Sequence, residues 1–303
     1  MRLSRRLAMT ALSLLSAASL VACGGTSSTT TSSSAPAEAP STTAAAGKLS
    51  GEITVLAAAS LKGVFQEIGD QLKADNPDLT IKFDFQGSQD LVTSLDQGNS
   101  ADVLATANNS TMTKAVEKHL VGEQTEFATN VLTLIVPKGN PKGITGLDSS
   151  LDGVDLVICA PEVPCGKASR ELAEAKGVTL NPVSEEQKVT DVVGKVESGE
   201  ADAGLVYVTD ATTAKDKVDK IDIPDNTVVN HYPIAPTAKP ANPEGAKAFI
   251  DAVTGETGQK VLAKYGFGAP TGTPASGAPA TPAAAPTSKD PEAGSAPTGT
   301  STP

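Results

Sequence analysis

The chain has 303 residues, a formal net charge of −11, and a composition that is 39% hydrophobic but only 3% aromatic, with no tryptophan. This length allows two lobes with separate cores, which must be built mainly from aliphatic side chains. The acidic balance argues against a nucleic-acid partner, which requires a basic surface. It does not exclude an anionic ligand, because local dipoles hold anions in acidic proteins.

The first 22 residues have the features of an export signal. Arginines at the start are followed by an apolar stretch at 7–20, which is too short for a comfortable membrane span. The stretch ends in Leu-Val-Ala-Cys at 20–23, which resembles a bacterial lipobox. We therefore expect residues 1–22 to be removed and a lipid on Cys23 to anchor the protein extracytoplasmically to the cell membrane. A plain secretory signal with a chance cysteine is the alternative.

Two segments are rich in Ala, Pro, Thr, Ser and Gly and contain almost no large apolar residue. Residues 23–48 are expected to form a disordered tether between the lipid and the fold. Residues 269–303 are expected to form a disordered tail.

Between these segments, strand and helix patterns alternate along the chain. Strands are expected at 52–58, 79–85, 101–106, 130–137, 154–160 and 203–208. Helices are expected from 60, 88, 166 and 189, with closing helices at 243–254 and 256–265. The alternation predicts an α/β fold, with mostly parallel sheets flanked by helices. Ligands of such folds bind beyond the carboxyl ends of the strands, where helices begin.

Four motifs each place a small polar or amide-presenting residue at the start of an expected helix. They are Ala58-Ala59-Ser60-Leu61, Gly87-Ser88-Gln89-Asp90-Leu91, Val163-Pro164-Cys165-Gly166 and Lys188-Val189-Thr190-Asp191. The first amides of a helix are unpaired and carry a partial positive charge, so helix starts hold anions without a charged side chain. Four starts that converge on one cleft would form a cage for an oxyanion. Each serine alone could instead be an ordinary N-cap, and Tyr207, at another strand end, could be a core aromatic.

Two cysteines remain once Cys23 is assigned to the lipid. An exported protein meets an oxidising compartment, so a disulfide between Cys159 and Cys165 is expected, and it would pin a tight proline-containing loop. A zinc site is not indicated, because the two histidines are scattered. A redox pair is not indicated either, because the spacing is not Cys-x-x-Cys.

Over residues 51–268 the chain resembles the periplasmic molybdate-binding proteins of ABC importers. Three of the motifs above carry the resemblance, together with Gly204-Leu205-Val206-Tyr207 and the following Thr209-Asp210-Ala211. The resemblance implies a two-lobed type II periplasmic-binding-protein fold with the ligand cleft between the lobes. The lobes would comprise residues 49–129 with 231–268, and residues 130–230.

The same resemblance implies that the protein captures molybdate, and tungstate with it, for delivery to an ABC permease. The ligand would be held by the Ser60, Ser88 and Tyr207 hydroxyls and by the backbone amides at Cys165 and Val189. No cofactor, bare metal ion or nucleic acid is expected, and the protein is expected to be a monomer.

Three alternatives compete with this hypothesis. A receptor for another tetrahedral oxyanion, such as sulfate, would differ in cavity size. A serine hydrolase would require a histidine base, and neither His119 nor His231 forms a recognisable constellation, so no enzyme is expected. An adhesion lipoprotein would explain the tether and tail, but not the ordered set of helix starts.

Overall fold

The computed structural model describes residues 48–271. The predicted export signal, the lipidated Cys23 and nearly all of the predicted tether and tail lie outside the described residues. Residues 269–271, which begin the predicted tail, lie against a strand, where Thr129 Oγ1 donates to the Ala269 carbonyl at 3.1 Å. No helix within residues 48–271 is both long and apolar enough to span a bilayer.

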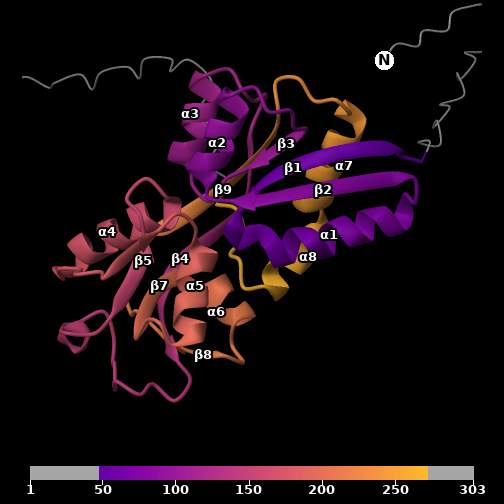
Figure 1. Ribbon diagram of the computed structural model, residues 1–303. Coiled ribbons are helices and arrows are strands. Elements are labelled where there is room, and N and C mark those ends of the chain that lie inside the picture. The colour runs from indigo at the N-terminus through magenta and orange to yellow at the C-terminus, as the bar shows by residue number, and fades with distance from the viewer. Residues whose placement is uncertain (1–47, 272–303) are drawn as a thin grey trace, which may run out of the picture. The chain divides into compact units, whose positions relative to one another are not determined.

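A nine-stranded sheet runs through the described residues (Figure 1). Its strands are β1 (Gly51–Ala58), β2 (Leu79–Gln86), β3 (Val103–Ala105), β4 (Thr125–Pro137), β5 (Leu156–Cys159), β6 (Ser184–Glu186), β7 (Ala203–Tyr207), β8 (Val218–Ile221) and β9 (Val229–Pro236). The strand order is β2-β1-β3-β9-β4-β7-β5-β6, with β8 also paired to β4.

Helices follow most of these strands. They are α1 (Lys62–Asp75), α2 (Ser88–Asp96), α3 (Asn109–Glu117), α4 (Pro164–Lys176), α5 (Val189–Ser198), α6 (Val208–Thr213), α7 (Pro243–Thr254) and α8 (Glu256–Lys264). Two short 3₁₀ turns, η1 (Ala59–Leu61) and η2 (Ser149–Leu151), complete the elements.

Two strands connect the halves of the sheet. β1 pairs in parallel with β2 and β3, and β5 pairs in parallel with β6 and β7. β4 pairs with β9 from Thr125 to Val131, and with β7 and β8 from Leu132 to Pro137. These pairings are all antiparallel. β4 carries the chain from one half to the other, and β9 returns it.

The half that contains β1, β3 and β9 has a core on each face of the sheet, and we call it the first lobe. Alternate residues of a strand point to opposite faces. Val55, Val103 and Ile234 accordingly pack against α1, α7 and α8, around Phe65 and Phe249. Leu56, Leu104 and Ala235 point the other way, against α2 and α3.

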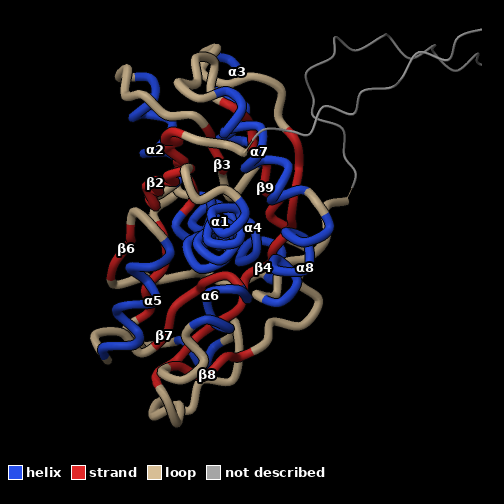
Figure 2. The backbone as a smooth tube through the Cα atoms, turned by 90° about the vertical axis from the view of Figure 1, so that its right-hand side faces the viewer, coloured by secondary structure: helices blue, strands red, loops and turns tan. Residues whose placement is uncertain are grey.

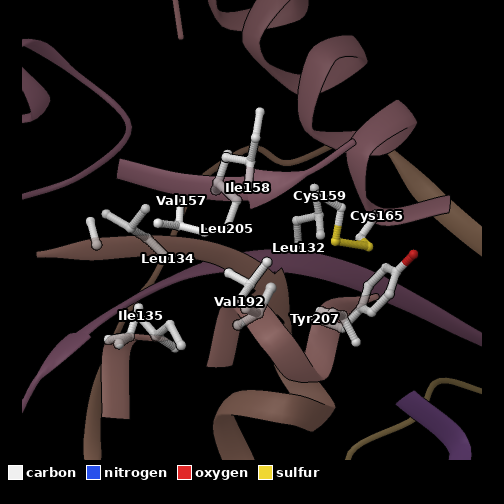
Figure 3. Packing of buried hydrophobic residues seen from close by; sticks show 14 of the residues in the cluster. Leu132, Leu134, Ile135, Val157, Ile158, Cys159, Cys165, Val192, Leu205 and Tyr207 are labelled. Carbon is white, nitrogen blue, oxygen red and sulfur yellow. A yellow bond between two sulfur atoms is a disulfide. The ribbon is translucent and has the colours of Figure 1, made fainter. Parts of the chain in front are cut away.

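The half that contains β5 and β7, together with the end of β4, forms the second lobe. Its core is aliphatic, as the composition requires, and includes Leu134, Leu205 and Val192. α5 and α6 lie beside β7 (Figure 2). Figure 3 shows the Cys159–Cys165 disulfide at the edge of this core, with the Tyr207 hydroxyl pointing away from the aliphatic side chains.

Some elements differ from the expected ones. β4 begins at Thr125, five residues before the expected start at 130. The start was missed because polar residues such as Glu126 and Asn130 interrupt the apolar pattern. Both nevertheless pair with β9. The strand expected to end at Val208 ends at Tyr207, since Val208 already begins α6. No strand was expected where β9 lies, because two prolines and His231 obscure the pattern there.

Candidate functional site

The five residues expected to bind the ligand line one cavity. Ser60 and Ser88 come from the first lobe, and Cys165, Val189 and Tyr207 come from the second. The cavity itself has a volume of about 10 Å³, and the space free of atoms around it, open solvent included, is about 210 Å³. The other lining residues are Ala58, Ala59, Gln86, Gly87, Ala107, Val163, Pro164 and Lys188. The structure brings the five together, and their contact with a ligand remains a prediction.

Three helices start at this cavity without a side-chain cap. They are α2, α4 and α5, whose N-cap residues Gly87, Val163 and Lys188 make no capping hydrogen bond. In contrast, the side chains of Asn108 and Asn242, which do not line the cavity, cap α3 and α7. Asp90 and Asp191, in the first turns of α2 and α5, donate their amides to the carbonyls of Gly87 and Lys188, while the earlier amides of these helices have no side-chain acceptor.

The start of α4 is held in a tight loop. Pro164 occupies the first turn, where a missing N–H costs nothing, and the adjacent Cys165 is joined to Cys159 at the end of β5 by a disulfide. Arg170 Nη1 donates to the carbonyls of Cys159 and Gly166, at 3.3 and 3.1 Å. The disulfide and the Arg170 hydrogen bonds thus connect the end of β5 to the first turn of α4, which contains the amide of Cys165.

Protein donors occupy the oxygens of two hydroxyls that line the cavity. Ser88 Oγ accepts from the Ala107 amide at 3.1 Å, and Tyr207 Oη accepts from Asn230 Nδ2 at 3.0 Å. Each hydroxyl also carries one hydrogen that it can donate. For Tyr207, the Tyr232 hydroxyl is a further hydrogen-bond partner beside the cavity.

Ser60 is part of a longer chain of hydrogen bonds. Its Oγ lies 3.1 Å from Tyr232 Oη, which in turn accepts from Asn130 Nδ2 at 3.5 Å. Either hydroxyl of the Ser60–Tyr232 pair can be the donor, so the two side chains share one hydrogen bond beside the cavity.

Burial keeps the two tyrosines protonated. It raises the pKa of Tyr207 well above its ordinary value and also raises the pKa of Tyr232. Behind Tyr207, burial raises the pKa of the Asp210 carboxyl to about 7, although the Tyr207 amide donates to its Oδ2 at 3.1 Å. Among the described residues that line the cavity there is no aspartate or glutamate.

Charged side chains lie at the edge of the site. Lys188 lines the cavity, and its Nζ is 3.9 Å from Asp191 Oδ1. Lys167, just after the Cys165 loop, lies 3.6 Å from Glu171 one helical turn on, and half of its side chain is exposed. Lys167 is therefore a solvated helix charge, whereas Lys188, to which no role was assigned from the sequence, is a cation of the cavity lining.

Asn130, Asn230 and Tyr232 were not predicted as part of the site. They lie on β4 and β9, and nothing in their local sequence marks them as partners of the cavity hydroxyls. Within residues 48–271, no group of three or more His, Cys, Asp and Glu side chains is arranged to hold a metal ion.

Residues 53–268, nearly all of the described chain, match the family of bacterial extracellular solute-binding proteins. The chain belongs to this family. A molybdate-binding protein of Mycobacterium tuberculosis, ModA, is 43% identical to this solute-binding protein over 258 residues, which cover 84% of this chain and 94% of the relative.

Solved structures of solute-binding proteins share the fold. The periplasmic molybdate-binding protein of Azotobacter vinelandii superposes with a TM-score of 0.64 at 17% identity, covering 72% of this chain and all of that one. The sulfate-binding protein SubI of M. tuberculosis superposes with a TM-score of 0.60 at 20% identity, and the match covers 71% of this chain and 86% of SubI. At these identities the likeness shows the fold alone, which is the two-lobed type II fold expected from the sequence.

Proposed function

We propose that this solute-binding protein captures molybdate, and tungstate with it, and delivers the oxyanion to the permease of an ABC importer. The observation that carries the proposal is the convergence of three uncapped helix starts and three donor hydroxyls on one cavity. The 43% identity to a molybdate-binding relative supports the choice of molybdate.

The donor set suits a fully deprotonated oxyanion. Molybdate at neutral pH is a tetrahedral dianion that only accepts hydrogen bonds. Hydroxyls and helix amides supply donors, while a lining carboxylate, which would repel the dianion, is absent from the described cavity residues. Phosphate retains a proton at neutral pH and would present a donor without a matching acceptor.

We infer that the two lobes close on the anion. The proposed lobes are residues 49–129 with 231–268, and residues 130–230, and the hinge lies where β4 and β9 pass between them. Ser60 and Ser88 on one side, and Cys165, Val189 and Tyr207 on the other, would all reach the anion only in the closed state. The ligand would then favour closure, because it binds that state more tightly.

The proposed setting is the outer face of the cell membrane. A lipid on Cys23, exposed by removal of residues 1–22, would hold a monomeric receptor close to its permease. We propose a binding role without catalysis. Neither histidine lines the cavity, and His231 Nδ1 instead lies 3.2 Å from Glu126 Oε2.

Sulfate is the alternative cargo, because it is also a fully deprotonated tetrahedral oxyanion that only accepts hydrogen bonds. Sulfate is smaller than molybdate, so cavity size would separate the two anions.

Calorimetric titration of the purified protein with molybdate, followed by sulfate and phosphate as competitors, tests the proposal. Tight one-to-one binding of molybdate that sulfate does not displace is expected. Preferential sulfate binding would change the cargo, and binding of none of the three would refute oxyanion capture.

A further inference from the structure

Gly87, at the start of α2, lies against the backbone of the other lobe. A Cβ atom at this position would come 2.3 Å from the carbonyl oxygen of Gln187, which lies between β6 and α5. Cβ atoms essentially never approach another heavy atom to less than 3.0 Å. The clash involves a backbone oxygen, which a side-chain rotation cannot relieve.

The neighbouring Gln89 contacts the same carbonyl of the other lobe. Its Nε2 donates to the Gln187 carbonyl at 3.1 Å, and it lies 2.4 Å from the position of a Gly87 Cβ. The lobes are therefore in direct contact through one carbonyl at the edge of the cavity. That carbonyl accepts from Gln89 of the first lobe.

The conformation of Gly87 does not itself require glycine. Its φ of −60° and ψ of 139° are ordinary extended values that any L-residue adopts. The Gln187 oxygen belongs to the other lobe, so the space beside Gly87 is open whenever the lobes are apart. A side chain here would be tolerated by the first lobe alone and rejected on closure.

We propose that Gly87 is a positioning residue for closure on the oxyanion: its missing side chain sets how near the two lobes approach, and so how completely both donor sets reach the ligand. This inference rests on the proposed function, because it assumes that the ligand is bound between closing lobes. Any Cβ at position 87 would hold the α2 and α5 helix starts apart.

Two other glycines provide the contrast. Gly166 directly follows the lining residue Cys165, but a Cβ there would meet the Ala160 carbonyl of its own lobe at 1.8 Å. A Gly166 substitution would therefore disturb the second lobe in every state. At Gly194 in α5, a Cβ would meet no atom within 4 Å, so Gly194→Ala is a matched control.

The test compares Gly87→Ala, Gly87→Ser and Gly194→Ala with the wild type, using molybdate as the probe. Both Gly87 variants add a Cβ atom. Serine is also a favoured N-cap residue, so Gly87→Ser should keep the start of α2 stable. Both are expected to melt close to the wild-type temperature without ligand and to bind molybdate at least about tenfold more weakly. Gly194→Ala is expected to keep the wild-type affinity.

Small-angle X-ray scattering adds a direct measure of closure. Molybdate should reduce the radius of gyration of the wild type and of Gly194→Ala, and should reduce it less in the Gly87 variants. Wild-type affinity in both Gly87 variants, or failure of both to fold without ligand, would overturn the inference. If the wild type itself bound no oxyanion, the proposed function would be refuted and the role of Gly87 would fall with it.

Discussion

Asn230 and Asn130 each donate an amide hydrogen to a tyrosine hydroxyl beside the cavity. An amide that donates to the phenol oxygen leaves the phenol hydrogen to point elsewhere. Asn230 therefore leaves Tyr207 a hydrogen to donate. Asn130 contacts Tyr232, which in turn shares a hydrogen bond with Ser60.

Loss of a cavity hydroxyl should weaken oxyanion binding. Tyr207→Phe and Ser88→Ala each remove a proposed hydrogen bond to a charged ligand, at an expected cost of about 1.5–3 kcal/mol, or a roughly 10- to 150-fold rise in Kd. Calorimetric titration with molybdate measures the change. Ser94→Ala, on α2 but not among the lining residues, should bind as the wild type does. Near-wild-type affinity in both cavity variants would mean that the site is elsewhere.

Asn230 should act on binding through Tyr207. Asn230→Leu removes the donor to Tyr207 Oη. It should weaken molybdate binding when Tyr207 is present, and should weaken it less in a protein that already carries Tyr207→Phe. A coupling energy of roughly 0.5–3 kcal/mol is expected from the four Kd values of the double-mutant cycle. Simple additivity would show that Asn230 matters only for the fold, where its amide also donates to the Ala107 carbonyl.

The elements that form the cavity could be predicted because their signals are local. Ser60 and Ser88 follow apolar strands and precede helical periodicity, and Cys165 and Val189 lie in the first turns of α4 and α5. β9 could not be predicted in this way, since its strand character comes from pairing with β3 and β4 rather than from an apolar pattern. Asn230 and Tyr232, which lie on β9, were missed for that reason.

The disulfide should make the start of α4 a better anion site. It joins β5 to α4 directly behind the Cys165 amide, so the loop has less freedom to lose on binding. Reduction of the disulfide is expected to lower molybdate affinity severalfold, as measured by titration with and without reductant. A variant with both Cys159→Ser and Cys165→Ser serves as the control, because its affinity should not respond to reductant. Unchanged affinity on reducing the wild type would contradict this role.

At the scale of the whole molecule, a buried acid ties stability to pH. The pKa of Asp210 is raised by burial from 3.8 to about 7, so between these values the folded protein binds more protons than the unfolded chain. The free energy of unfolding should therefore fall as the pH rises from about 4 to about 7.

Asp210→Asn should remove this contribution while an amide oxygen still accepts from the Tyr207 amide. The loss of stability between pH 5 and pH 8, measured by urea unfolding without ligand, should be smaller in the variant by a few kcal/mol at most. An identical pH profile for Asp210→Asn would refute the assignment.

The sequence by itself determined the α/β class, the aliphatic cores, the helix starts and the cysteine pair, because hydrophobic period, turn chemistry and composition act over a few neighbouring residues. Tertiary structure alone decided that β4 and β9 cross between the lobes, that Asn130 and Asn230 contact the tyrosine hydroxyls, and that Gly87 meets Gln187. Most of those contacts join residues far apart in the chain, and their geometry exists only once the whole sheet has formed.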